Sequence, residues 1–207
     1  MNMVKICGLK TLDEIRWTAE AGADLGGIVV FYPKSKRNLD IKEAAFLLDK
    51  VKAFEKPLKM VAVTVSPKLP DVMAIEKAGF DYVQIHGELE REVLEGSTIP
   101  IIKAFNVRDI GDYSKYRSAE KIAGFVFDAG IPGSGEGFDY SLLEGIAEKA
   151  DRGKLMLLAG GLNPHNVRAA METTGFSGAD TSTGVENEEG TGKSRQKIFS
   201  FVRNARF

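Results

Sequence analysis

Cys7, the single cysteine of the chain, ends the apolar run VKIC and is followed directly by a glycine. Alternate side chains of a strand share a face, so Lys5 and Cys7 are expected on one face, with Val4 and Ile6 on the other. A lone buried cysteine usually serves core packing only. An ammonium group two residues away, however, favours the thiolate and lowers a thiol pKa that starts near ~8.5. Cys7 is therefore a candidate base or nucleophile, and Lys5 is expected to tune it.

Asp128 ends a second apolar run, GFVFD, and shares one strand face with Gly124 and Val126. Desolvation at the end of such a strand raises the pKa of a carboxyl group and keeps it protonated, as a general acid requires. The alternative is a helix N-cap or an ion-pair partner, since both are common for an aspartate after a strand. The glycine-rich segment 129–137 that follows suits either a mobile flap over a site or an exposed loop.

Two segments near the C-terminus have the composition of an anion-binding site. Gly160 and Gly161 follow an apolar run in LAGGLNPHN, and Ser182, Thr183 and Gly184 follow another in DTSTGVE. Glycines let backbone N–H groups approach an anion closely, and a helix N-terminus adds free donors. Paired glycines alone more often make a tight turn, but the hydroxyls and glycine of the next unit favour phosphate. These five residues are predicted to bind it.

Other polar residues at strand ends are candidates for binding a substrate. Gln84 and His86 share a face of the run YVQIH, although a lone histidine on a strand is more often structural. Arg37 in FYPKSKR is either a solvated charge or a ligand for a substrate carboxylate. Asp180 in DTSTGVE is a further candidate. Segment 186–197 is most simply a solvated turn and helix start.

These side chains require a scaffold of alternating strands and helices, which the hydrophobic periodicity predicts. Eight β-rich runs are expected at 3–7, 25–32, 59–65, 82–87, 100–105, 122–128, 155–160 and 178–183. Helix-like stretches follow at 11–23, 40–54, 69–79, 88–96, 107–116, 139–150, 163–175 and 193–206.

Eight such units predict an α/β fold with a parallel sheet covered by helices, and eight is the number that a (β/α)8 TIM barrel requires. We expect residues 1–207 to form a single barrel domain; a doubly wound open sheet is the alternative. Barrels of this kind place the active site at the C-terminal ends of the strands, where all the candidate residues above are found.

Composition excludes several other classes of protein. The formal net charge of −1 lacks the basic excess that nucleic acid or an anionic membrane would favour. One cysteine and two histidines permit no internal disulfide and make a structural zinc site improbable. The apolar runs are shorter than the roughly 18 residues of a transmembrane helix, and no secretory signal precedes them. A cytoplasmic location is expected.

The motifs VKICG, FYPKSKR, VQIHGE, FVFDA, GSGEGFDY, LAGGLNPHNV and DTSTGVE together resemble the phosphoribosylanthranilate isomerase family, the (β/α)8 enzymes of tryptophan biosynthesis. The resemblance runs over nearly the whole chain. It implies an Amadori rearrangement of N-(5′-phosphoribosyl)anthranilate to 1-(o-carboxyphenylamino)-1-deoxyribulose 5-phosphate, without cofactor or metal.

By position, the resemblance makes Cys7 the general base and Asp128 the general acid, and it assigns the anthranilate carboxylate to Arg37. The five glycine and hydroxyl residues match the family's phosphate loops. Two departures are small, since AGGL stands where the family often has SGGL and STG where it often has SSG. The expected partner is a small-molecule substrate, neither nucleic acid nor a membrane is expected, and the protein is expected to be a monomer or a homodimer.

Three alternatives remain within the barrel fold, two of them enzymes and one a binding protein. A pentose-phosphate epimerase would carry metal-binding histidines on several strands, whereas only His86 and His165 exist here. A histidine-pathway isomerase uses aspartates as both acid and base, whereas the first strand here supplies Cys7. A phosphate-ligand sensor on a barrel without catalysis would need neither Cys7 nor Asp128.

Overall fold

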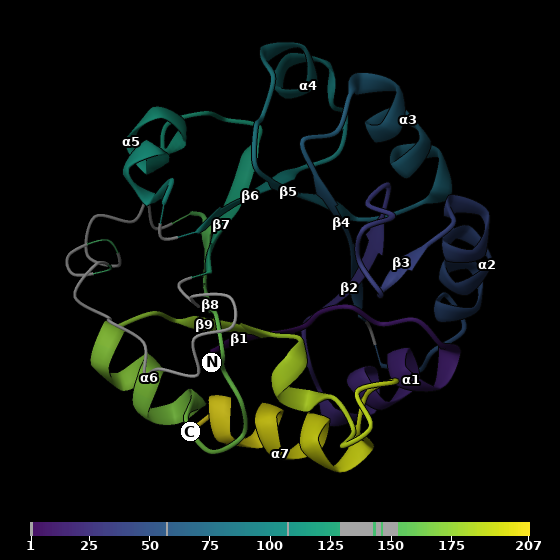
Figure 1. Ribbon diagram of the computed structural model, residues 1–207, viewed down its shortest axis with the longest axis vertical. Helices are drawn as coiled ribbons and strands as arrows, with labels where there is room; N and C mark the ends of the chain where they lie inside the picture. The colour runs from purple at the N-terminus through teal and green to yellow at the C-terminus, as the bar shows by residue number, and fades with distance from the viewer. Residues whose placement is uncertain (1, 57, 107, 129–142, 144–145, 147–152) are drawn as a thin grey trace.

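The structure is a computed structural model that describes residues 2–56, 58–106, 108–128, 143, 146 and 153–207. Its centre is a barrel of parallel strands, with helices around the outside (Figure 1). The barrel strands are β1 (Met3–Ile6), β2 (Leu25–Val30), β4 (Lys59–Val65), β5 (Tyr82–His86), β6 (Ile101–Asn106), β7 (Ile122–Asp128), β8 (Leu155–Ala159) and β9 (Gly178–Thr181).

The pairing of β1 closes the barrel. Lys5 lies opposite Leu25 of β2 on one side and opposite Asp180 of β9 on the other. Each of the other barrel strands pairs in parallel with its two neighbours. This closure excludes the doubly wound open sheet and confirms the predicted (β/α)8 TIM barrel. A two-residue strand that the sequence did not predict, β3 (Asn38–Leu39), adds to the edge of β2.

Helices cover the barrel in the order in which they were predicted, with two differences. They are α1 (Leu12–Ala21), α2 (Ile41–Val51), α3 (Leu69–Ala78), α4 (Arg91–Gly96), α5 (Tyr113–Tyr116), α6 (Val167–Thr174) and α7 (Arg195–Ala205), with 3-10 turns η1 (Ile110–Asp112) and η3 (Thr183–Val185). The helix predicted over 107–116 is only η1 and α5. Side-chain turns compete with helix there, since Asn106 Oδ1 accepts the N–H of Arg108 at 2.8 Å. The helix predicted over 139–150 falls largely outside the described residues.

Alternation along the strands divides the core into two layers. Val4 and Ile6 are fully buried on the outer face, against the helices. Residues facing the barrel axis form a smaller cluster that includes Val61, Ile102 and Leu157. Lys5 is also fully buried and belongs by alternation to the inner layer. The first strand therefore directs an ammonium group into the barrel, as its sequence predicted.

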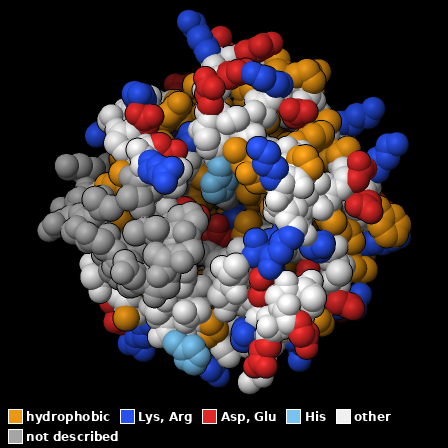
Figure 2. All heavy atoms as spheres, viewed as in Figure 1, with side chains coloured by type: hydrophobic (Ala, Val, Ile, Leu, Met, Phe, Trp, Pro, Cys, Tyr) orange, Lys and Arg blue, Asp and Glu red, His pale blue; other side chains and the backbone are white. Residues whose placement is uncertain are grey.

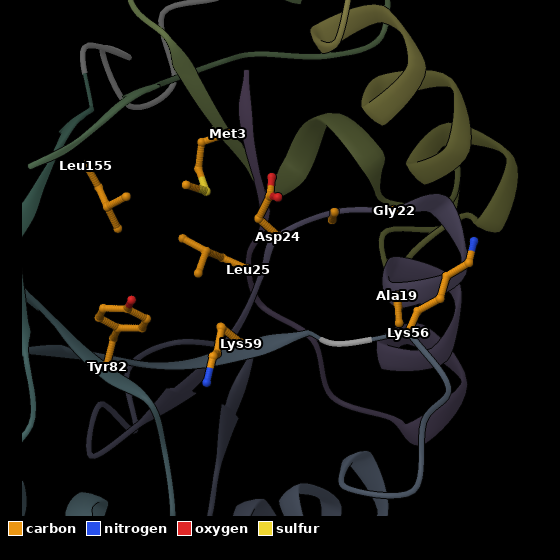
Figure 3. A pocket seen from close by; sticks show the side chains of 10 residues that line it. Met3, Ala19, Gly22, Asp24, Leu25, Lys56, Lys59, Tyr82 and Leu155 are labelled. Atoms are coloured by element: carbon orange, nitrogen blue, oxygen red, sulfur yellow. The ribbon is translucent and has the colours of Figure 1, made fainter. Parts of the chain in front are cut away.

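The N-terminal ends of the barrel strands surround a cavity of about 420 Å³ (Figure 3). Met3, Leu25, Tyr82 and Leu155 surround it in the close-up view. Lys59 lies at its edge, and the ammonium group of Lys59 forms an ion pair with Asp81 at 2.7 Å. Among the described residues, no helix combines the length and apolarity needed to cross a membrane.

Candidate active site

The strand ends opposite that cavity bring the predicted polar residues to one face of the barrel. Cys7 directly follows β1, His86 ends β5, Asp128 ends β7, and Asp180 lies in β9. Figure 2 shows a hollow near the centre of this face in which acidic and histidine side chains lie, with lysine and arginine side chains around it. Strand alternation directs these side chains inward, and the closed barrel brings the ends of the four strands to the same face.

A buried ion pair lies beneath this hollow. Lys5 Nζ lies 2.9 Å from Asp180 Oδ2, and neither residue has appreciable contact with solvent. Burial alone would lower the pKa of Lys5, but the charge of the facing Asp180 carboxylate holds that pKa above its ordinary value. Asp180 Oδ1 has no hydrogen-bond partner among the described residues. The sequence predicted both residues as inward or site residues but not their pairing.

Cys7 differs in one respect from the expectation. Burial raises the pKa of its thiol above the ordinary value, although the charge of Lys5 acts to lower it. Lys5 thus acts on the thiol pKa in the predicted direction, but the net shift is upward, which the sequence did not predict. The reason is that burial, the largest cause, outweighs the charge of Lys5, and the negative charge of Asp180 adds to the effect of burial.

Gly27 of β2 makes the space that Cys7 and Lys5 occupy. A Cβ atom at this glycine would lie 3.1 Å from Cys7 Sγ and 3.2 Å from Lys5 Nζ. Those separations are closer than ordinary van der Waals contact, so any larger residue displaces one of the two groups. The thiol and the ammonium group thus lie against the same point of the neighbouring strand.

On β5, Gln84 and His86 interact along their shared face. Gln84 Nε2 lies 2.8 Å from His86 Nε2, and the amide can donate to the ring nitrogen when His86 is neutral. Burial, with the positive charges of Lys5 and Lys103, lowers the pKa of His86 to about 4. The imidazole is therefore neutral at pH 7, and Gln84 fixes its orientation.

Arg37 extends from the loop after β2 to a residue that the sequence analysis did not single out. Its Nε donates to Glu186 Oε1 at 2.7 Å, and its Nη2 donates to the same oxygen. Lys193 is also buried, and its Nζ donates to the carbonyl of Ser182 at 2.9 Å. The prediction of a solvated turn at 186–197 is therefore wrong at Glu186 and Lys193. Glu186 ends the motif DTSTGVE and Lys193 follows the run GTG, and neither segment has a hydrophobic periodicity that predicts burial.

The two predicted phosphate loops pack directly on each other. A Cβ atom at Gly184 would lie 1.9 Å from the carbonyl oxygen of Leu162, so only glycine fits. Thr181 Oγ1 donates to that same oxygen at 2.6 Å. Within the described part of the chain, the N–H groups of Gly161 and Gly184 donate to no other group. These free donors are what an anion site requires.

The remaining residues of the two predicted phosphate loops form a sharp turn and a contact with the first strand. Gly160 and Gly161 have positive φ angles of 95° and 67°, as a sharp turn after β8 requires. Ser182 uses its hydroxyl to donate to the carbonyl of Cys7 at 3.0 Å. Thr183 begins the 3-10 turn η3. Together these contacts join the tip of β1 to the loops after β8 and β9.

Asp128 occupies the end of β7 and is half-buried. Its register partners are Asn106 on β6 and Ala159 on β8. Ala159 belongs to the inward-facing cluster of the barrel, so Asp128, its register partner, is directed inward as well. The segment 129–137, proposed as flap or loop, lies outside the described residues. Among the described residues, no group of three or more histidine, cysteine, aspartate or glutamate side chains could hold a metal ion.

A closed barrel of eight parallel strands with buried ionisable groups gathered at the C-terminal strand ends defines a (β/α)8-barrel enzyme. The family model of N-(5′-phosphoribosyl)anthranilate (PRA) isomerase matches residues 4–204. The chain therefore belongs to the PRA isomerase family, as its motifs indicated.

Individual relatives agree with this assignment. An N-(5′-phosphoribosyl)anthranilate isomerase of Myxococcus xanthus is 36% identical over 211 residues, which cover 98% of this chain and 95% of that protein. The crystal structure of phosphoribosyl anthranilate isomerase from Thermotoga maritima is 33% identical, with a TM-score of 0.84 over 100% of this chain and 99% of that one. A further structure holds reduced 1-(o-carboxyphenylamino)-1-deoxyribulose 5-phosphate, at 31% identity, a TM-score of 0.81 and the same coverage.

Proposed function

We propose that this protein converts N-(5′-phosphoribosyl)anthranilate to 1-(o-carboxyphenylamino)-1-deoxyribulose 5-phosphate in tryptophan biosynthesis, with Cys7 as general base and Asp128 as general acid. One observation carries the assignment of roles. In the sheet order β1-β9-β8-β7, the two strands that lead into the phosphate loops lie between the strands of Cys7 and Asp128. A sugar anchored by its phosphate on those loops has the base on one side and the acid on the other.

The reaction then needs one proton given and one proton taken. Asp128 donates a proton to the ribose ring oxygen as the C1′–O bond breaks, and the nitrogen lone pair forms a protonated Schiff base. Cys7 removes the proton from C2′, and the electron pair of that bond forms an enolamine. Tautomerisation of the enolamine gives the ketone, so the reaction is an isomerisation without net oxidation.

The raised pKa of Cys7 is consistent with a base that is deprotonated only when the reaction intermediate has formed. Burial keeps the resting thiol protonated at neutral pH. A cationic Schiff base beside Cys7 lowers the thiol pKa as any nearby positive charge does, and the thiol proton leaves to solvent, to which Cys7 is partly exposed. The intermediate thereby helps to generate the base that consumes it.

The remaining site residues are assigned to binding. Arg37 holds the aromatic carboxylate, and Gln84, His86 and Asp180 contact the ribosyl part of the substrate. The phosphate is held by Gly160, Gly161, Ser182, Thr183 and Gly184. The ligand of the related structure, a carboxyphenylamino sugar phosphate, carries both anionic ends that this arrangement would bind. We further propose that residues 1–207 form one barrel domain that acts as a monomer or homodimer.

Turnover of phosphoribosylanthranilate, made in situ and followed by loss of its fluorescence, tests the proposal. Cys7→Ser and Asp128→Asn are each expected to lower kcat by about 10³-fold or more, since each removes one proton-transfer group. Asp112→Asn is the control, because Asp112 is a partly exposed carboxylate on η1 that pairs with Lys115. Turnover is expected to persist in EDTA. Full activity of either site variant, or an inactive wild type, would contradict the proposal.

A further inference from the structure

Glu186 holds the guanidinium group of Arg37 along one edge only. The Nε and Nη2 atoms of Arg37 both donate to Glu186 Oε1. A guanidinium group has five N–H donors, so this contact leaves the Nη1 donors and one donor on Nη2. Within the described residues, these have no acceptor. The free edge has the forked geometry that matches a carboxylate.

Glu186 is itself fixed by two lysines. Lys36 Nζ donates to its second oxygen at 3.0 Å, and Lys193 Nζ lies 3.7 Å from the first. Burial would raise the pKa of Glu186, but hydrogen bonds from Lys36 and Arg37 hold it below its ordinary value. One carboxylate thus faces three cations, and the cluster as a whole remains positive. A second carboxylate is attracted to it rather than repelled.

The backbone around Glu186 is as well fixed as its side chain. Glu186 and Lys193 pair as an antiparallel bridge, and Asn187 N–H donates to the Gly192 carbonyl at 2.9 Å. Glu14 of α1 accepts the N–H of Lys193 at 2.7 Å, and Glu14 is nearly fully buried. The loop is therefore anchored to the first helix, and the Arg37–Glu186 contact is a built feature of the site.

We propose that Glu186 is a positioning residue that makes the site specific for substrates with a carboxylate on the aromatic ring. By occupying the Nε edge of Arg37, it directs the remaining edge toward that carboxylate. The inference rests on the proposed function, in which Arg37 binds the anthranilate group. Competition is the opposing possibility, in which Glu186 takes the place of the substrate carboxylate and must be displaced.

Calorimetric binding of two ligands tests the inference without requiring turnover. One ligand is reduced 1-(o-carboxyphenylamino)-1-deoxyribulose 5-phosphate, and the other is the same compound without its carboxylate. In Glu186→Gln we expect the affinity for the first to fall about tenfold and for the second to change by less than about twofold, since only one charge-assisted pair is lost. Glu90→Gln is the matched control, because Glu90 also pairs with a lysine, Lys68, in a different loop.

A double-mutant cycle with Arg37→Met shows whether Glu186 acts through Arg37. The Glu186→Gln change is expected to have no further effect on either affinity in the Arg37→Met background. Glu186→Asp, which keeps the charge but shortens the side chain, should show a smaller loss of the same selective kind. Tighter binding of the carboxylated ligand in Glu186→Gln, or an equal loss for both ligands, would overturn the proposal. Wild-type turnover separately decides the proposed function.

Discussion

Lys5 and Asp180 form a 2.9 Å ion pair across the junction of β1 and β9, one inward-facing layer beneath Cys7. The pair leaves the thiol between two opposite charges, one of which lowers its pKa while the other raises it. Burial of the thiol raises the pKa more than either charge changes it, so the resting residue is a thiol. The reactivity of Cys7 is thus set by a balance that single substitutions can shift.

Removal of Lys5 should make Cys7 less reactive. Lys5→Met eliminates the charge that favours the thiolate and leaves burial of the thiol in place, so the apparent pKa of Cys7 should rise. The rate of alkylation of Cys7 by iodoacetamide, measured against pH, gives this apparent pKa. In the wild type the rate should still rise with pH above the ordinary thiol pKa of about 8.5. Lys42→Met, an exposed lysine on α2, is the control. An unchanged midpoint in Lys5→Met would show that Lys5 has no such effect.

Gly27→Ala should impair catalysis more than stability. Its Cβ atom would crowd Cys7 Sγ and Lys5 Nζ, and we expect kcat/KM to fall by about tenfold or more, since small displacements of a catalytic group are costly. Gly26→Ala is matched, because its Cβ atom would meet Leu58, Leu9 and Met60 at similar separations but on the apolar outer face. Both variants should unfold at similar urea concentrations. Equal kcat/KM values for the two would argue against a role for Gly27 in placing the thiol.

His86 should make the protein sensitive to acid. Its folded pKa of about 4 lies below the ordinary 6.5, so between these values the unfolded chain binds a proton that the folded protein does not. Above pH 6.5 neither state binds this proton, so the imidazole does not lower the free energy of unfolding. As the pH falls from 6.5 toward 4, proton binding by the unfolded chain lowers that free energy by up to about 3 kcal/mol, at roughly 1.4 kcal/mol per pKa unit.

Urea unfolding at pH 7 and pH 4.5 measures this loss. In His86→Gln the difference between the two free energies of unfolding should be smaller than in the wild type. His165→Gln, which changes an exposed histidine, should retain the wild-type difference. If His86→Gln and the wild type lose the same stability on acidification, the imidazole does not stay neutral in the folded protein.

Gly184→Ala should separate the two loops that are predicted to bind phosphate. The added Cβ atom would overlap the carbonyl oxygen of Leu162, a backbone atom that can move only with its whole loop, and we expect a loss of about 3 kcal/mol in the free energy of unfolding. Competitive inhibition by inorganic phosphate should also weaken. Gly111→Ala, where an added Cβ atom meets nothing within 4 Å, is the control. Wild-type phosphate inhibition in Gly184→Ala would place the anion elsewhere.

The sequence predicted what depends on local periodicity. The alternation of VKIC and GFVFD placed Lys5, Cys7 and Asp128 on inward faces, and the closed barrel then brought distant strand ends together. The roles of Cys7 and Asp128, and the phosphate loops, stay predictions. Family motifs also identified the family, because they combine residues from most of the strands.

Other features depend on packing between distant residues. Arg37 and Glu186 are 149 residues apart in sequence, and neither segment has a periodicity that points to the other. The net direction of the Cys7 pKa shift depends on the depth of burial and on Asp180, which the local pattern around Cys7 does not contain. The short α5 depends on side-chain turns that override a helical pattern.

The pairing of β1 with β9 also dictates when the site can form during synthesis. Lys5 and Asp180 are 175 residues apart, so the strand that precedes Cys7 leaves the ribosome long before its partner. Contacts of such long range form late, because the entropy of closing the intervening chain opposes them. Until β9 arrives, Lys5 has no carboxylate to face and β1 has an open edge on that side. A nascent chain that ends before Asp180 therefore cannot close the ring, and we expect the Cys7 thiol to acquire its final surroundings only in the last stage of folding.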